Sequence, residues 1–473
     1  MQKNLTDNSE LATCTIQLQP FAKFLQPIIT DVLAEHKKDK YRNGTKLTPD
    51  VLVWVILTLT LRRDLSYPKI INWLLSGIRW TTIDKPAIIL KCGAISHART
   101  KLGVSVIRNI FHKSIAKFKK INPDFYGLVT VAFDGTALTI PDTDKNREEF
   151  GKHESGRGKS AYPQMRVVAL LATSHRIIID FAYAAIKGKK TGERTLMMEI
   201  LGKVTKTNLL FLFDAGFYSF VLAYQMIENN QDFIMKMSKN TKLPERPGSR
   251  LSDGSYLSTI TGKIEVESGG KCNRKKWKKV SFTVRVIIFQ VPGFRPVRLI
   301  TTLQNSSITD KEIIIHYHTR WDIEISYDEI KTHQCATLKG HEPTIFRSKR
   351  PDLVKQELYA MLTVYNLIRE LIVEASNKYN IVPLQISFLD TLQWVIESCP
   401  MLSLHTGKRL NNMVNYLLKM ISESLIDRPR RHRSNPRVVK IKMSNYNRKR
   451  EKHRSESVDF ANNIELLTAL PNC

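Results

Sequence analysis

Cysteine is scarce in this sequence of 473 residues, which carries six. The six are scattered, and none forms a Cys-x-x-Cys pair with the spacing of zinc ligands. We therefore expect no structural zinc site. The cysteines are Cys14, Cys92, Cys272, Cys335, Cys399 and Cys473.

Long hydrophobic runs are also missing. The longest, residues 51–61, is well short of the roughly 20 residues that a membrane-spanning helix needs, and Arg62 and Arg63 close it. This run predicts a buried helix, for which Pro49 and Asp50 give a favourable start. The first residues hold no basic segment leading into an apolar stretch with a cleavage site, so nothing suggests export. We expect a cytoplasmic protein without membrane contact.

Acidic residues are outnumbered. Lysine and arginine together number 73 against 44 for aspartate and glutamate, which gives a formal net charge of +29 and a pI near 9.8. This excess predicts a polyanionic partner, and nucleic acid is the commonest because each neutralised phosphate releases counterions. A basic membrane-surface or ribosomal protein would show a similar excess.

The chain is long enough for two or three domains. Residues 1–122 are predicted to be helical, and a helix pair broken by Gly103 is compatible with a helix-turn-helix-like DNA-binding domain. A plain helical bundle fits the same pattern. Residues 123–350 are predicted to form a mixed α/β domain, with strands over 128–136, 165–172, 176–184, 209–214 and 232–237. A β-rich insertion is expected at about 238–306, and a long helix over 309–333.

Residues 351–473 are predicted to be a helical region with a basic tail. In residues 427–454 lysine and arginine face only Asp427 and Glu451 as acidic side chains. Such a run predicts a solvated arm, and its expected ligand is a phosphate backbone.

Two apolar strands each end in an aspartate, Asp134 in VAFDGT and Asp214 in LFDAGFYS. Carboxylates at the ends of neighbouring strands can bridge hard cations such as Mg²⁺, which prefer oxygen ligands and keep water for substrate phosphates. Either aspartate alone is weak evidence, because Asp-Gly after a strand is more often a turn.

A third acidic residue lies on the predicted helix 309–333. Tyr317, Arg320, Glu324 and Lys331 are spaced i, i+3, i+7 and i+14, which places them on one helix face. The opposite face is expected to be apolar, with Ile314, Trp321, Ile325 and Ile330. The polar face has the groups for a metal ligand and phosphate clamps, and an exposed salt-bridge stripe is the alternative.

The spacing Tyr-x2-Arg-x3-Glu-x6-Lys resembles the signature around the catalytic glutamate of the insertion-sequence-4 family of DDE transposases. Four further blocks resemble that family in the expected order, and the resemblance spans most of the chain, weakest before about residue 90. The blocks are DGTALTIPDT (134–143), the stretch from Phe150 to Arg166, DAGFYS (214–219) and RSNPRVVKIKMSNY (433–446).

The resemblance implies an α/β fold with a ribonuclease H-like catalytic core interrupted by a β-rich insertion and flanked by helical regions. It implies that Asp134, Asp214 and Glu324 bind metal, expected to be two ions of Mg²⁺ or Mn²⁺. Three parts of the chain are expected to contact DNA: the signature, the insertion and the Phe150–Arg166 stretch. The tryptophan of the insertion could stack on a flipped base, or it could anchor a small sheet. The residues expected to contact DNA are Tyr317, Arg320, Lys331, Trp277, Arg157 and Lys159.

The resulting hypothesis is a transposase that binds the inverted-repeat ends of a bacterial insertion sequence, cleaves them and transfers the 3′-hydroxyl ends into target DNA. A homodimer in the synaptic complex and nucleoid association are expected. One alternative is a ribonuclease H-like nuclease or resolvase that joins no strands. The other is a transposase-derived DNA-binding protein with a dead active site, against which the intact acidic triad argues.

Overall fold

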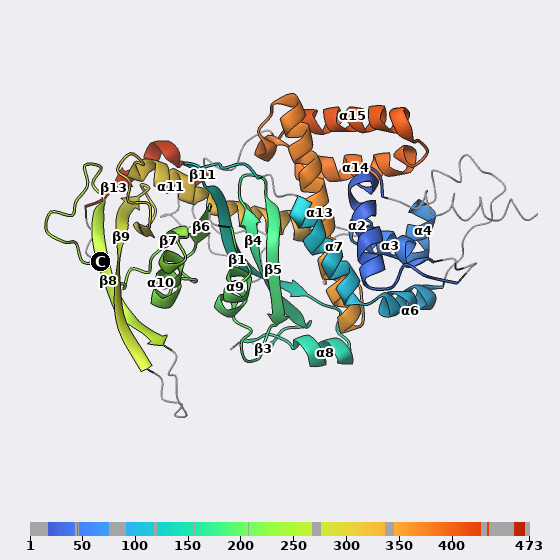
Figure 1. The fold of residues 1–473 in the computed structure, drawn as a ribbon, viewed down its shortest axis with the longest axis horizontal. Coiled ribbons are helices and arrows are strands. Elements are labelled where there is room, and N and C mark those ends of the chain that lie inside the picture. Colours follow the sequence, from blue (N-terminus) through green and yellow to red (C-terminus); the bar gives the residue numbers. More distant parts are fainter. Residues whose placement is uncertain are drawn as a thin grey trace, which may run out of the picture. The chain divides into compact units, whose positions relative to one another are not determined.

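The computed structural model of the chain describes residues 18–42, 45, 47–74, 91–117, 121–155, 158–206, 208–266, 276–335, 345–426, 433–434 and 458–468. The chain folds into two compact units, each assembled from three stretches of sequence (Figure 1). Unit 1 consists of Met1–Ile121, Gly135–Gly202 and Glu324–Asp427. Unit 2 consists of Asn122–Asp134, Lys203–Ile323 and Arg428–Cys473.

Unit 1 is mainly helical and is built around the long helix α13 (Pro351–Tyr379), most of which is buried. The helices that pack on α13 come from both ends of the chain. They are α3 (Pro49–Leu61), α6 (Cys92–Leu102), α7 (Val104–Lys117), α8 (Asp144–Phe150), α14 (Phe388–Leu402) and α15 (Gly407–Glu423). Helices α2 (Ala22–Glu35) and α4 (Tyr67–Leu74) complete this layer by packing on α3.

Helix α3 is the buried helix that its apolar sequence predicts. Every residue from Val51 to Leu61 is buried. Pro49 opens the helix, where a missing N–H costs nothing, and the Thr48 hydroxyl donates to the Asp50 carboxylate at 2.5 Å. A helix that is apolar on all sides needs neighbours on all sides, and α2, α4, α6 and α13 provide them.

The central sheet has the strand order β5-β4-β1-β6-β7. Its strands are β1 (Val129–Thr139), β4 (Gln164–Ala172), β5 (Ile177–Ala185), β6 (Leu209–Phe213) and β7 (Asp232–Lys236). In unit 2, β1, β6 and β7 run parallel. In unit 1, β4 and β5 form an antiparallel pair. This meander followed by parallel strands is the predicted α/β, ribonuclease H-like arrangement, and β1 passes from unit 2 into unit 1 after Asp134.

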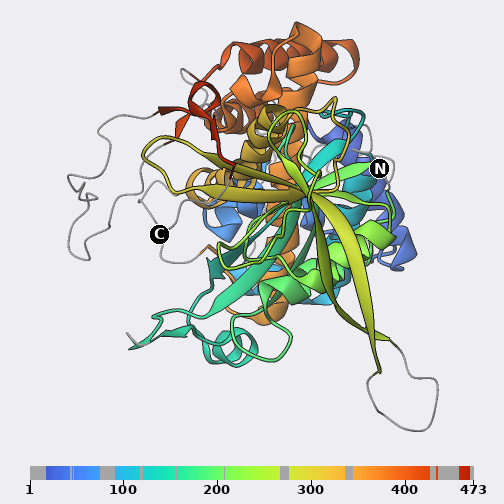
Figure 2. The ribbon, with the colours of Figure 1, turned by 90° about the vertical axis from the view of Figure 1, so that its left-hand side faces the viewer.

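The predicted β-rich insertion extends the sheet within unit 2. Strands β8 (Tyr256–Val266), β9 (Lys276–Gln290) and β10 (Val297–Thr301) all lie in it. Strand β10 pairs with both β7 and β9, so the insertion continues the sheet beyond β7. Strands β8 and β9 form a long twisted ribbon, seen best in Figure 2.

The C-terminal segment of unit 2 adds a short strand to β9. Strand β13 (Glu465–Leu466) pairs antiparallel with β9, and β12 (Val458–Asp459) pairs with β11 (Arg433–Ser434). The Phe460 ring stacks on His318 with the ring centroids 4.3 Å apart. The rest of the predicted basic tail 427–454 lies outside the described residues. Within the described ranges, no helix is long and apolar enough to cross a membrane.

Candidate active site

The two aspartates of the sequence prediction occupy matching positions on neighbouring parallel strands of unit 2. The register of β1 with β6 runs from Val129↔Leu209 to Ala132↔Leu212. Asp134 and Asp214 each follow the last of these pairs by two residues, and both side chains are half-buried. Both aspartates therefore lie just beyond the paired stretch of β1 and β6, Asp214 directly after the end of β6 and Asp134 within β1.

Aromatic residues pack against one another directly before the two aspartates. Phe133 and Phe213, which immediately precede the two aspartates, are fully buried, and their rings stack with centroids 5.6 Å apart. Phe211 stacks on Phe213 at 6.0 Å. Buried aromatic side chains carry much of the packing energy of a core. Each aspartate therefore directly follows a tightly packed phenylalanine, Asp134 within β1 and Asp214 at the end of β6.

Strand β1 does not turn at the Asp-Gly pair. The sequence predicts a turn at Gly135, whereas β1 continues to Thr139. An ideal Cβ at Gly135 would lie 2.6 Å from Cδ of Glu193, a residue at the start of α9 (Glu193–Leu201). The missing side chain of Gly135 leaves room for the Glu193 side chain, and the glycine makes no turn.

Helix α11 (Asp310–His318) of unit 2 contacts the start of β1 and the end of β6. The Tyr317 hydroxyl donates to the carbonyl oxygen of Phe213 at 3.1 Å, next to Asp214. His316 is hydrogen-bonded with the Thr130 hydroxyl at 2.6 Å and stacks on Phe125 at 3.9 Å. A capping box formed by Thr309 and Glu312 begins the helix. These contacts fix the helix that leads to the predicted glutamate.

The predicted helix 309–333 is helical throughout, but its geometry changes twice. After α11 come a 3₁₀ turn (Thr319–Trp321), the helix α12 (Asp322–Asp328) and a π-helical turn, η2 (Glu329–Gln334). Glu324 is half-buried on α12. Tyr317 and Arg320 are buried, with 8% and 7% of their surface exposed. The 3₁₀ and π turns are not visible in the spacing, which assumes an ideal α-helix.

Trp321 departs from the predicted apolar face of this helix. Ile314 and Ile330 are buried as expected, whereas 43% of Trp321 is exposed. The Arg320 guanidinium lies 5.7 Å from the centre of the Trp321 ring. The tryptophan is therefore an accessible aromatic surface three residues before Glu324, and sequence reasoning missed it by assigning it to the core.

Lys331 is held within unit 1. Its Nζ donates to the Thr136 hydroxyl, and it lies 6.0 Å from the centre of the Tyr327 ring. Side chains two residues apart in a strand point to the same face, so Thr136 shares the face of β1 from which Asp134 projects. The ammonium group of Lys331 is thus hydrogen-bonded to β1 at Thr136, two residues beyond Asp134.

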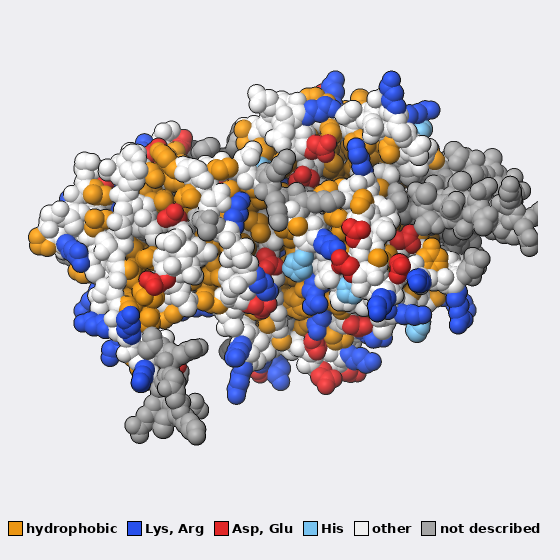
Figure 3. Space-filling view, in the orientation of Figure 1, with side chains coloured by type: hydrophobic (Ala, Val, Ile, Leu, Met, Phe, Trp, Pro, Cys, Tyr) orange, Lys and Arg blue, Asp and Glu red, His pale blue; other side chains and the backbone are white. Residues whose placement is uncertain are grey.

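The predicted DNA contacts outside the helix fall on exposed residues where the structure describes them. On β9, Trp277 is 56% exposed, which disfavours a role as the anchor of a small sheet. Lys276, Lys278 and Lys279 beside it are also exposed, and Lys and Arg side chains gather at this end of the β8–β9 ribbon (Figure 3). Lys159 is exposed on a short strand. Arg157 lies outside the described residues.

The donor chemistry of the acidic residues fits a hard divalent cation, because all three offer carboxylate oxygen. Within the described ranges, no group of three or more His, Cys, Asp or Glu side chains is gathered closely enough to hold a metal ion. Of the predicted triad, the strand pairing in unit 2 relates only Asp134 and Asp214 to each other. They lie at equivalent positions two residues beyond the last paired residues of β1 and β6.

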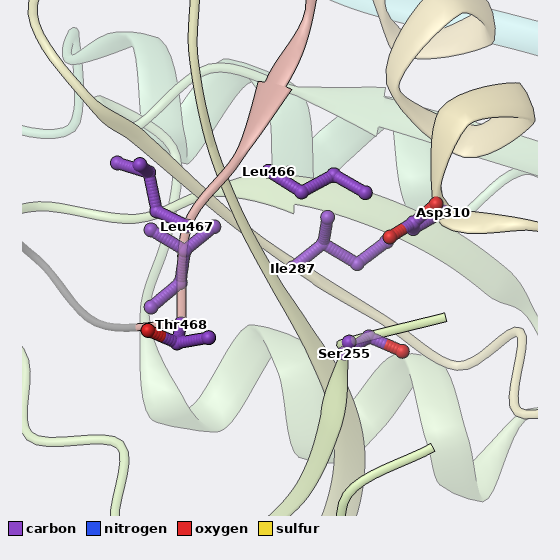
Figure 4. Close-up of a pocket in the computed structure, with 8 residues that line it drawn as sticks. Ser255, Ile287, Asp310, Leu466, Leu467 and Thr468 are labelled. Atoms are coloured by element: carbon purple, nitrogen blue, oxygen red, sulfur yellow. The ribbon is translucent and has the colours of Figure 1, made fainter. Parts of the chain in front are cut away.

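A small pocket in unit 2 lies apart from these residues. It has a volume of about 50 Å³ and is lined by Ser255, Ile287, Asp310 and the segment after β13 (Figure 4). This volume holds one or two water molecules and no nucleotide. Burial and the neighbouring Asp253 raise the pKa of Asp310 above its usual value.

Comparisons with known proteins agree with these observations. The family described as "Transposase DDE domain" matches residues 126–367, and the family described as "Insertion element 4 transposase N-terminal" matches residues 15–112. "Transposase InsG for insertion sequence element IS4" of Escherichia coli (strain K12) is 27% identical over 436 residues, which cover 89% of this chain and 92% of that protein.

Two further similarities extend over different shares of the chain. "Putative transposase InsZ" of the same organism is 28% identical over 135 residues, or 28% of this chain and 44% of its own length. A solved structure, the cryo-EM structure of a piggyBac transposase synaptic complex with hairpin DNA, covers 86% of this chain and 84% of its own, with a TM-score of 0.42 and 12% identity.

The family match covers half of the chain, and enzymes with this domain depend on divalent metal ions. The chain therefore belongs to the DDE transposases of the insertion-sequence-4 type, and it is an enzyme that acts on DNA.

Proposed function

We propose that Asp134, Asp214 and Glu324 are the metal-binding and catalytic residues of this transposase, and that they hold two ions of Mg²⁺ or Mn²⁺. The observation that supports this proposal is that the two aspartates stand at equivalent positions, each two residues beyond the last paired residues of the parallel strands β1 and β6. Two-metal sites place ions about 4 Å apart between carboxylates, which two neighbouring strands are suited to hold. Glu324 follows Tyr317 by seven residues, about two helical turns.

The reaction that we propose has two steps. In the first, water attacks the phosphorus at the end of the element, and the bond from phosphorus to the 3′ oxygen breaks, which leaves a 3′-hydroxyl on the element. In the second, that hydroxyl attacks a target phosphodiester, forms the new bond and releases the 3′-hydroxyl of the target. The bound ions supply activation of the attacking oxygen and stabilisation of the leaving oxygen.

The basic residues of the signature position the DNA. Lys331 is proposed to contact a phosphate on the Asp134 face of β1, which its hydrogen bond to Thr136 supports. Arg320 is proposed to add a second phosphate contact. Tyr317 would reach a phosphate only by giving up its hydrogen bond to Phe213. We therefore propose that Tyr317 holds α11 against the end of β6, beside Asp214.

Recognition of the element ends is proposed to use the N-terminal helical domain, the basic tail and the β8–β9 ribbon. An exposed tryptophan among lysines is suited to stack on an unpaired base while the ammonium groups bind its phosphates. Trp277 has this setting on β9. Lys159 and Arg157 would add phosphate contacts, and two copies of the chain are proposed to bridge the two inverted repeats in the synaptic complex.

The experiment that tests the triad measures cleavage of a duplex carrying the terminal inverted repeat, and joining of pre-cleaved ends to a plasmid, in Mg²⁺. Glu324→Ala is expected to lower both rates by about 1000-fold or more while the affinity for the duplex changes little, because the side chain acts on the reacting groups. Glu423→Ala is the matched control, since it removes an exposed carboxylate from α15, another helix of unit 1. Unchanged cleavage by Glu324→Ala would overturn the assignment.

A further inference from the structure

A buried ionic cluster surrounds the first residue of the π turn in unit 1. The Glu329 carboxylate is 5% exposed. It accepts hydrogen bonds from Nη1 of Arg176 at 2.8 Å, from Nε of Arg369 at 3.1 Å and from the Tyr365 hydroxyl at 2.9 Å. Nη2 of Arg369 donates a further bond. Each carboxylate oxygen therefore has two donors, which fixes the orientation of the group.

The cluster connects two separate elements, the β4–β5 turn and α13, to the π turn. Arg176 comes from the β4–β5 turn, where it has a φ of +54°, a conformation that non-glycine residues rarely adopt. Tyr365 and Arg369 come from α13. Between them, Asn366 accepts from the backbone N–H of Ile178 at 2.9 Å and donates to its carbonyl at 2.8 Å. The turn and the helix that hold Glu329 are thus pinned to each other.

Stability alone is a poor explanation for this arrangement. Burying a carboxylate and two guanidinium groups costs much of what their attraction returns, and apolar residues of similar size often stabilise a core as well. Burial opposes ionisation of Glu329, but Arg369 and Arg176 outweigh it and hold its pKa below the usual value. What charged groups offer beyond apolar packing is a defined direction for the atoms that they bind.

The π turn needs such a constraint. The N–H of Cys335 donates to the carbonyl of Ile330 at 3.0 Å, a bond that spans five residues instead of four. A π turn inserts one residue into the helix and rotates everything that follows it, and such turns are rare and frequently occur at functional sites. Lys331 lies inside this turn, two residues after Glu329.

We infer that Glu329 is a positioning residue for Lys331: held by Arg176, Tyr365 and Arg369, it fixes the π turn in the phase that brings the Lys331 ammonium group to Thr136. This inference rests on the phosphate role proposed for Lys331. Glu329 itself, buried and fully hydrogen-bonded, touches no DNA. Its effect on the reaction passes through the direction of the Lys331 side chain.

A double-mutant cycle tests the inference, with single-turnover cleavage of the terminal-repeat duplex as the readout at saturating protein. Lys331→Ala is expected to lower the rate constant by about 100-fold, as loss of one charged donor to the transition state does. Glu329→Gln is expected to lower it by about 10-fold or more through misplacement of the lysine. The double variant should be no slower than Lys331→Ala, because the two changes remove the same contribution.

Asp253→Asn provides the matched control. Asp253 pairs with the fully buried Arg285 in unit 2, and it belongs to neither the π turn nor the elements that hold Glu329. Its loss is expected to lower the melting temperature as Glu329→Gln does. Any effect of the control variant on the rate should be the same factor in the wild type and in the Lys331→Ala background. If Glu329→Gln fails to fold, Tyr365→Phe serves instead, because it removes one hydrogen bond from the cluster. The inference is supported if Tyr365→Phe lowers the rate about threefold in the wild type and has no effect on the rate in the Lys331→Ala background.

The outcomes separate this inference from the proposed function. If Lys331→Ala cleaves normally, the role proposed for Lys331 is wrong, and the inference is wrong with it. A second outcome is that Lys331→Ala cleaves slowly while Glu329→Gln and Tyr365→Phe slow the reaction by the same factor with or without Lys331. In that case, or if Glu329→Gln and Tyr365→Phe both cleave at the normal rate, Glu329 does not position the lysine. Only this inference is then overturned. The Glu324→Ala result is unaffected by either outcome.

Discussion

Replacing Glu370 by glutamine is expected to stabilise unit 1 above neutral pH. Glu370 lies on α13, where burial, and after it the nearby carboxylate of Glu374, raise its pKa to about 7 from an ordinary 4.5. The folded state thus binds a proton that the unfolded chain has already released between these two values. Glutamine removes the ionisation and keeps the shape and most of the polar contacts.

The sign and size follow from proton linkage. Below about pH 4.5 the carboxyl is protonated in both states, so it costs nothing. Between about pH 4.5 and 7 the unfolding free energy falls as pH rises, and above about 7 the full penalty remains. A pKa difference of about 2.5, at about 1.4 kcal/mol for each tenfold change in the ionisation equilibrium, amounts to about 3 kcal/mol.

The measurement is the melting temperature of the wild type and Glu370→Gln from pH 4 to pH 8.5. We expect the variant to melt on the order of 5 °C higher at pH 8 and the two curves to converge near pH 4.5. Glu374→Gln, at an exposed position on the same helix, should give a smaller gain because it removes the lesser cause. A variant that gains nothing at pH 8, or gains equally at both ends of the range, would refute the reasoning.

Four further predictions concern the site. EDTA should stop cleavage, and Mg²⁺ or Mn²⁺ should restore it; cleavage that persists in the chelator contradicts a metal-dependent site. Gly135→Ala should lower stability by less than about 1 kcal/mol, because the Glu193 side chain that it displaces is 48% exposed; a large drop in melting temperature would speak against this. Thr136→Val should slow cleavage about 10-fold by releasing Lys331, while Thr136→Ser retains the rate, and equal rates in both variants would count against the contact. Trp277→Ala should weaken binding of the terminal-repeat duplex by about 1–3 kcal/mol in a fluorescence titration, with Trp277→Phe closer to wild type; unchanged affinity would exclude stacking.

The sequence predicts the sheet and the position of both aspartates well. Fully apolar runs such as residues 209–213 can only be central strands or buried helices, and their length favours strands. Once β1 and β6 are known to be parallel, Asp134 and Asp214 follow at equivalent positions just beyond the paired stretch. The aromatic residues that precede them, Phe133 and Phe213, are part of the same apolar runs.

What the sequence does not predict depends on neighbours far along the chain. Gly135 suggests a turn until Glu193 is seen to occupy the space of its missing side chain. Trp321 fits an apolar helix face, but 43% of its surface is exposed. The π turn follows from contacts of Glu329 with residues about 40 and 150 positions away, which no local pattern contains.

The boundaries between the two units have a practical consequence for work with fragments. The chain leaves unit 2 between Asp134 and Gly135, and it leaves it again between Ile323 and Glu324. Neither unit is one contiguous segment, so no single cleavage of the gene yields either of them alone. Insertions used to separate the units would interrupt the chain directly beside Asp134 or Glu324, and biochemical dissection therefore needs point substitutions.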